Sequence, residues 1–183
     1  MMEKSAKPYE RAQQTTPTGC EMNVFTGIQY SATGVFGYSF RQNEKEVLRI
    51  DSAVLPNPDI HLQGFGAKLV HRAFDASITI LPGMRRVLED EHGSVQGFYE
   101  YFDVNVYRIA VKGAEAYVYV RADFWEVTVD MEAAARISRV PQALRTRFTE
   151  NGYDMENRFT IAIADTVPEA LYPYILAIPV LGF

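Results

Sequence analysis

Four arginines in the last third of the chain form its densest basic cluster. They are Arg136, Arg139, Arg145 and Arg147, and Arg121 and Arg158 could join them. Guanidinium groups make forked, charge-assisted hydrogen bonds with phosphate oxygens, so the four arginines are candidate ligands for a phosphate-bearing headgroup. An ordinary solvated surface, balanced by Glu132, Glu150 and Glu156, explains the same cluster more simply.

A second polar group, at residues 89–92, combines three carboxylates with an imidazole. Glu89, Asp90, Glu91 and His92 carry the oxygen and nitrogen atoms that divalent metals accept as ligands. Adjacent side chains in a tight turn point in different directions, however, and the spacing of a calcium-binding loop is absent. Asp90-Glu91-His92-Gly93 is typical of a polar hairpin turn, so we predict no metal site and no cofactor.

Residue types used in nucleophilic catalysis are present but scattered. Cys20, His61, His71 and His92 lie apart in the sequence, and neither a Gly-x-Ser-x-Gly elbow nor a His-Glu-x-x-His motif occurs. Residues 64–68, Gly-Phe-Gly-Ala-Lys, lack the glycine spacing of a phosphate-binding loop, and we expect a bend there. No motif specifies a reaction.

The composition is that of one ordinary globular domain. The chain has 183 residues, of which 48% are hydrophobic and 22% charged, enough to bury a sizeable core. Its formal net charge of -5 disfavours a nucleic-acid partner. Cys20 is the only cysteine, which excludes intramolecular disulfides and fits a reducing compartment. Because the first residues lack the apolar segment of a secretory signal, we expect a cytoplasmic protein.

Alternation of apolar and polar residues predicts short strands along most of the chain after residue 20. Two are expected between residues 22 and 40, where Gly27, Gly34 and Gly37 would form bends or bulges. Others are expected at residues 46–50, 76–80, 84–88, 95–102, 104–111, 115–121, 124–130 and 159–164. Residues 1–20 are polar and aperiodic, and we expect a flexible N-terminal arm, followed by a single domain at residues 21–183.

The end of the chain is almost wholly apolar, and a helix without a polar face must be enclosed. We expect this helix at residues 167–181, with Thr166 and Glu169 as a capping box and a kink at Pro173. With two prolines and too few residues to span a bilayer, it is predicted to be a core helix. Residues 131–148 fit either a helix capped by Asp130 or a strand. The predicted fold is therefore mainly β, an antiparallel barrel or strongly curved sheet that encloses the C-terminal helix.

The order of these segments resembles the tubby C-terminal-like superfamily, in particular its LURP-one-related and scramblase-like members. The resemblance covers residues 85–183 and rests on residues 134–139, Tyr153, the strand at 159–163, the closing apolar helix and the turn at 90–93. It implies a closed antiparallel barrel around a hydrophobic C-terminal helix. Tubby proteins bind phosphoinositides through basic residues on the barrel surface, but no position of this chain aligns with those residues.

The leading prediction is a non-catalytic binding module of tubby-like type, for a phospholipid headgroup or a protein partner. The alternative is a small, hydrolase-like enzyme with a cleft at the barrel rim. Its chemistry would come from carboxylates such as Glu100 and Asp103 beside Tyr99 and Tyr101.

Overall fold

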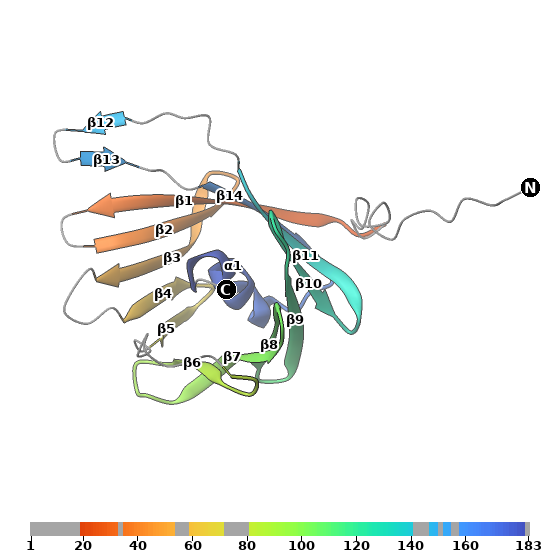
Figure 1. Cartoon of the computed structure of the whole chain (residues 1–183). Coiled ribbons are helices and arrows are strands. Elements are labelled where there is room, and N and C mark those ends of the chain that lie inside the picture. The colour runs from red at the N-terminus through yellow and green to blue at the C-terminus, as the bar shows by residue number, and fades with distance from the viewer. Residues whose placement is uncertain are drawn as a thin grey trace, which may run out of the picture.

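Antiparallel strands surround a C-terminal helix in the computed structural model (Figure 1). The structure describes residues 19–32, 35–53, 59–71, 81–140, 147–149, 152–154 and 158–181. Within these residues, twelve strands close into a barrel in the order β1-β14-β11-β10-β9-β8-β7-β6-β5-β4-β3-β2. Two further strands form a separate hairpin, β12–β13, which projects from one end of the barrel. The predicted fold class is confirmed.

The barrel strands have the following bounds. The first half consists of β1 (Met22–Ala32), β2 (Val35–Gln42), β3 (Lys45–Ala53), β4 (Ile60–Gly64), β5 (Ala67–His71) and β6 (Arg85–Glu89). The second half consists of β7 (Val95–Asp103), β8 (Val106–Val111), β9 (Ala114–Val120), β10 (Phe124–Val129), β11 (Glu132–Arg139) and β14 (Arg158–Ala164). The separate hairpin comprises β12 (Arg147–Thr149) and β13 (Gly152–Asp154). The sequence did not indicate β4 or β5.

Residues 132–139 form a strand, which decides for a strand in the first part of residues 131–148, where a helix or a strand was expected, whereas residues 141–146 lie outside the described residues. Asp130 does not cap a helix, because Asp130 and Met131 both have positive φ and form the turn between β10 and β11. β11 pairs with β10 and β14, and its register shifts beside Ala134, so that Ala134 and Ala135 are both buried. Pairing on two sides outweighs the helix propensity of the alanines.

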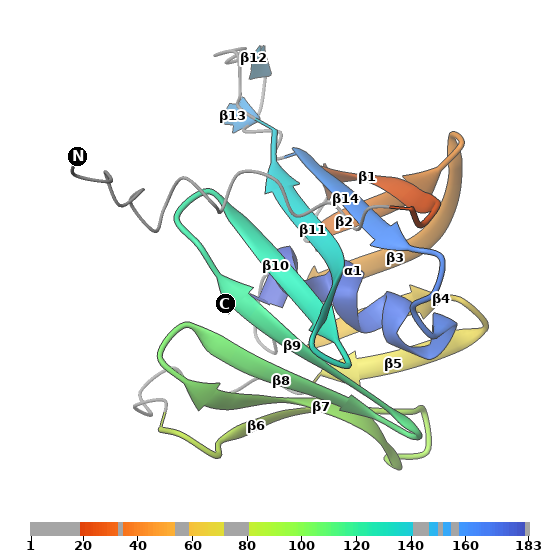
Figure 2. The ribbon, with the colours of Figure 1, turned by 90° about the vertical axis from the view of Figure 1, so that its right-hand side faces the viewer.

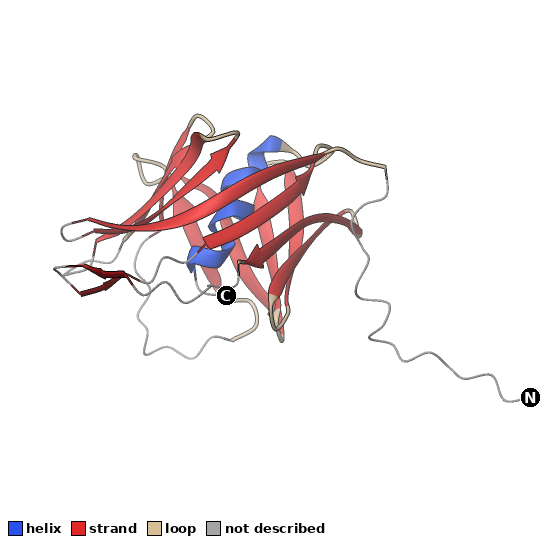
Figure 3. Cartoon of the chain, turned by 90° about the horizontal axis from the view of Figure 1, so that it is seen from above, coloured by secondary structure: helices blue, strands red, loops and turns tan. Residues whose placement is uncertain are grey.

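The C-terminal helix fills the barrel, as Figures 2 and 3 show. A 3₁₀ turn, η2 (Glu169–Leu171), leads into α1 (Tyr172–Leu181), and eight of the ten residues of α1 are buried. Full burial of Ile175, Leu176 and Ile178 stabilises the fold by about 1.5–3 kcal/mol each. The predicted enclosure of an apolar helix is therefore confirmed.

Two details predicted for this helix were wrong. The capping box is not formed, because Pro168 occupies the N-cap of η2 and no side chain caps it. Pro173 is the second residue of α1, where an amide would have no intrahelical partner, so we assign no helix-breaking cost to it. The proline within the helix is Pro179. None of the helices in the described part of the chain has the length and apolarity to cross a bilayer.

Two glycines predicted to bend or bulge the first strands instead make room for aromatic rings. A Cβ on Gly27 would lie 2.6 Å from the ring of Phe40, and one on Gly37 would lie 2.3 Å from the ring of Tyr30. Neither glycine lies at a register shift. Gly34, residues 1–18 of the predicted arm and the predicted strand at 76–80 lie outside the described residues.

Candidate functional site

The barrel opens between β5 and β6, where its strand pairing is shortest. These strands pair only at Val70 with Glu89 and at His71 with Leu88, whereas β4 and β5 pair along five residues each. Residues 67–69 of β5 therefore have no partner on the β6 side among the described residues. Figure 2 shows β5 and the β6–β7 hairpin diverging toward the end of the barrel where α1 begins.

Two adjoining cavities occupy this opening, and we call them together the rim groove. The outer cavity, of about 450 Å³, lies between residues 66–69 and the turn at residues 90–92. The inner cavity, of about 360 Å³, reaches the start of α1. Its walls include Phe65, Val111, Lys112, Glu169, Pro173 and Tyr174, and both cavities are lined by Ala67, Leu69 and Gln96.

The β4–β5 turn forms one wall of the rim groove and is fixed by aromatic packing. Phe65 and Gly66 both have positive φ, at 49° and 71°. A bulky residue rarely adopts this backbone conformation, so the packing of Phe65 must stabilise it. The Phe65 ring lies 5.7 Å from that of Tyr172 and 6.4 Å from that of Phe25, both edge-on. The turn is thus tied to the first residue of α1 and to β1.

The β6–β7 turn forms the opposite wall and is held by one carboxylate. Asp90 Oδ1 accepts the backbone N–H groups of His92 and Ser94, each at 2.9 Å, and Oδ2 accepts Gln96 Nε2 at 2.8 Å. These hydrogen bonds, first that from Ser94, lower the pKa of Asp90. The predicted polar turn is confirmed, and no group of three or more potential metal ligands occurs within the described residues.

The wall of the inner cavity includes Tyr174, whose buried hydroxyl group has no hydrogen-bond partner among the described residues. Tyr174 is 2% exposed, and its hydroxyl oxygen is buried next to Gly97, where a Cβ would lie 2.5 Å from it. Its backbone carbonyl, by contrast, accepts a hydrogen bond of 2.6 Å from the Tyr99 hydroxyl. Burial raises the pKa of Tyr174 to about 12, so the hydroxyl remains a proton donor at neutral pH.

Charges of both signs lie at the mouth of the inner cavity. Lys112, in the β8–β9 turn, and Glu169, in η2, are exposed, and neither forms an ion pair with another described residue. Phe65, Leu69 and Pro173 provide apolar surface beside them. The rim groove therefore suits a ligand with an apolar part and a hydrogen-bond acceptor, which could reach the exposed Lys112.

The predicted arginine cluster is divided by the fold. Arg136 and Arg139 lie three positions apart on β11, so strand alternation directs them to opposite faces. The Arg136 guanidinium stacks on Phe124 at 3.9 Å, whereas Arg139, at the exposed end of the strand, lies 6.0 Å from the ring of Phe159. Arg147 belongs to β12, and Arg145 lies outside the described residues.

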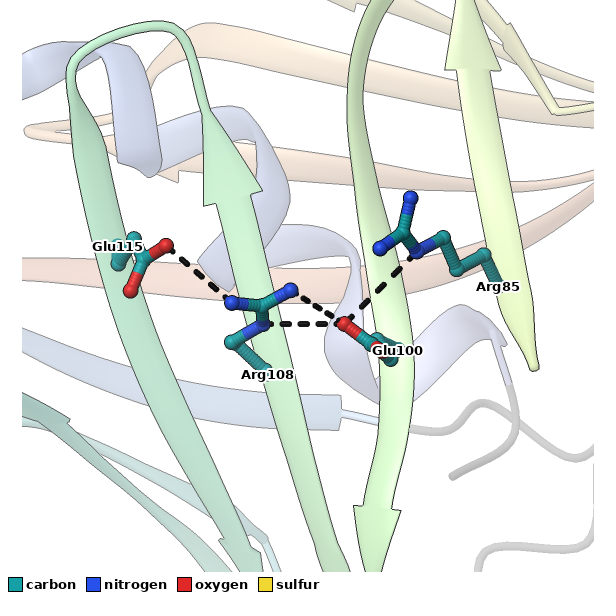
Figure 4. Close-up of polar contacts among 4 residues, drawn as sticks. All are labelled: Arg85, Glu100, Arg108 and Glu115. Atoms are coloured by element: carbon teal, nitrogen blue, oxygen red, sulfur yellow. Dashed lines mark hydrogen bonds and ion pairs between the residues drawn. The ribbon is translucent and has the colours of Figure 1, made fainter. Parts of the chain in front are cut away.

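Two of the residues named for a hydrolase-like cleft, Tyr99 and Glu100, lie on opposite faces of β7. Tyr99 is buried against α1, while Glu100, the next residue, lies on the outer face of β7. Glu100 Oε2 accepts Arg108 Nε at 3.1 Å and lies 3.8 Å from Arg85 Nε (Figure 4). Arg108 Nη1 also lies 3.4 Å from Glu115. These ion pairs engage Glu100 in a charged ladder across β6–β9.

The remaining candidates are also separate from the rim groove, apart from His92. His71 is buried, its Nδ1 lies 3.2 Å from the carbonyl oxygen of Val87, and burial lowers its pKa. His61 lies exposed on β4, and Cys20 is partly buried as a free thiol. The predicted bend at residues 64–68 is confirmed as the β4–β5 turn.

Sequence reasoning did not single out Gln96, Lys112, Glu169 or Tyr174 as groove residues. Tyr174 carries the one recognisable signal, a hydroxyl group within an apolar helix. The others depend on how the turns meet at the barrel end. Comparisons with protein-family models, with curated proteins and with solved structures find no significant match.

Proposed function

We propose that this protein is a non-catalytic binding module of tubby-like type and that it holds its ligand in the rim groove. A closed barrel around a C-terminal helix is the architecture that the tubby-like resemblance implied, and it supports the proposal. The observation that carries it is the Tyr174 hydroxyl, a buried donor with no hydrogen-bond partner among the described residues, on a side chain in the wall of an open groove. A buried donor without a partner costs free energy, and a bound acceptor would remove that cost.

Binding accounts for this site better than catalysis does. The raised pKa keeps Tyr174 protonated, so it can donate a hydrogen bond but cannot act as a base near neutral pH. Asp90 is engaged by its own turn and Gln96 is hydrogen-bonded to it. Hydrogen bonds to Asp90 in one turn and ring contacts of Phe65 in the other hold the walls in place, which suits recognition of a ligand.

The test is a screen of small polar fragments against the full chain by saturation-transfer NMR. Fragments that carry an acceptor and an apolar ring should bind, and the Tyr174→Phe variant should bind them about tenfold more weakly. Tyr119→Phe is the matched control, because Tyr119 lies outside the rim groove beneath the guanidinium of Arg121. Equal binding by the two variants would exclude the rim groove as the site.

Arg139 is exposed at the end of β11. This exposed guanidinium supports a phospholipid headgroup as a second candidate ligand class. Co-sedimentation with vesicles containing phosphatidylinositol phosphates tests this class. If the arginines bind the headgroup, Arg139→Glu should abolish sedimentation and Tyr174→Phe should leave it unchanged. If sedimentation depends on Tyr174 alone, the headgroup occupies the rim groove.

A further inference from the structure

We infer that the ligand of the rim groove is an extended peptide segment of a protein partner, which adds as a strand to the open half of β5. This inference rests on the proposed function and specifies its ligand. Three observations lead to it: the backbone direction at Lys68, the shape of the outer cavity and the polar groups of the inner cavity.

The hairpin register directs the backbone of Lys68 into the rim groove. Phe65 and Gly66 form a two-residue turn, and Gly64 pairs with Ala67 across it. The two residues that close such a hairpin hydrogen-bond to each other through their backbone N–H and C=O groups. The N–H and C=O of the next residue therefore point away from the partner strand. Lys68 is that next residue, and its backbone groups therefore face the β6 side.

The same alternation accounts for the pairing that β6 does make. Val70, two residues beyond Lys68, also directs its backbone toward β6, and Val70 pairs with Glu89. Lys68 has no such counterpart among the described residues, because β6 ends at Glu89 and the chain turns away at Asp90. Within the described part of the chain, the N–H and C=O of Lys68 therefore have no strand partner on this side, which is the arrangement that accepts an added strand.

The outer cavity has the position that an added strand would need. It runs between residues 66–69 and the turn at residues 90–92 and occupies about 450 Å³. A peptide there would lie beside β5 and could bond to both backbone groups of Lys68. Side chains of an extended peptide alternate, so one of them would enter the inner cavity.

The inner cavity indicates which side chain that would be. Its volume of about 360 Å³ has apolar walls at Phe65 and Pro173, with a donor at Lys112 and an acceptor at Glu169. A glutamine fits this set, because its carbonyl oxygen accepts from Lys112 and its amide donates to Glu169. We therefore expect peptides with Gln at one position, flanked by residues that favour extended backbone.

Selection from a displayed library of random peptides, with the full chain as bait, tests the inference. Lys68→Pro removes the backbone N–H donor of this residue without removing a hydrogen bond to β4. It should weaken the binding of the selected peptides about tenfold. Lys68→Ala keeps the donor and should bind them as the wild type does. Hydrogen exchange of the Lys68 amide in the wild-type protein gives a second readout that does not depend on the proline variant, and bound peptide should slow it.

The inference is overturned if no peptide is selected, if the proline and alanine variants bind equally, or if peptide leaves exchange at Lys68 unchanged. Should fragments still require Tyr174 in that case, the proposed function stands with a different ligand. Should fragments also bind independently of Tyr174, the proposed function fails with it.

Discussion

Replacing Tyr174 with Phe should stabilise the free protein while it weakens ligand binding. The hydroxyl oxygen is buried and has no hydrogen-bond partner in the described part of the chain, a state that costs about 1–3 kcal/mol. Phe keeps the ring packing and removes the unpaired donor, although it leaves a small void beside Gly97. We expect the free energy of unfolding to rise by about 1 kcal/mol, which corresponds to about 2–4 °C in Tm for a chain of this size.

Tyr99→Phe is the matched control with the opposite sign. Tyr99 is 1% exposed, and its hydroxyl donates a 2.6 Å hydrogen bond to the carbonyl oxygen of Tyr174. Removing that donor loses a satisfied buried hydrogen bond, so the free energy of unfolding should fall by about 1 kcal/mol. The two variants delete the same atom type from neighbouring buried rings, whose centroids are 5.8 Å apart.

Urea denaturation followed by circular dichroism, with thermal melts as a second readout, measures both changes. If the free energy of unfolding of Tyr174→Phe falls by about 1 kcal/mol or more, the Tyr174 hydroxyl has a hydrogen-bond partner in the free wild-type protein. The argument that the rim groove contains an unpaired donor would then be refuted, whatever the result for Tyr99→Phe.

Three further predictions concern the barrel itself. Arg86 donates to the carbonyl oxygen of Leu181 at the C-terminal end of α1, so Arg86→Met should lower the free energy of unfolding by about 2 kcal/mol in urea titrations. Burial lowers the pKa of His71 in the folded protein, so the unfolded chain binds a proton at this histidine first as the pH falls. Between pH 7.5 and 5.5, the free energy of unfolding of the wild type should therefore fall more than that of His71→Asn. Glu100→Gln should cost about 1 kcal/mol at low salt, whereas Glu115→Gln, at the exposed end of the ladder, should cost almost nothing.

The architecture could be predicted because its signals are local. Alternation along residues 115–121 and 159–164 indicates strands with one buried face, and an uncharged C-terminal segment requires enclosure. Residues 131–148 were ambiguous because alanine suits a helix, and only pairing with β10 and β14 decides the outcome. The missed strands β4 and β5 are short, with one fully buried residue in β4, so their pattern is weak.

The candidate site could not be predicted because it depends on the register in which β5 and β6 pair, not on a sequence motif. Its walls are three turns and a helix start that meet only when the barrel closes, and the opening depends on β6 pairing with just two residues of β5. The arginine cluster shows the opposite case, in which residues close in sequence are separated by the fold. Strand alternation places Arg136 and Arg139 on opposite faces of β11.

The central claim is that ligand binds at the rim groove. A ¹⁵N–¹H NMR map of the full chain, titrated with the tightest fragment or peptide from the screens above, tests it most directly. We expect shifts concentrated at Lys68, Gln96, Lys112 and Tyr174, with β11 unaffected. Shifts centred on Arg136 and Arg139, with the groove residues unchanged, would contradict it.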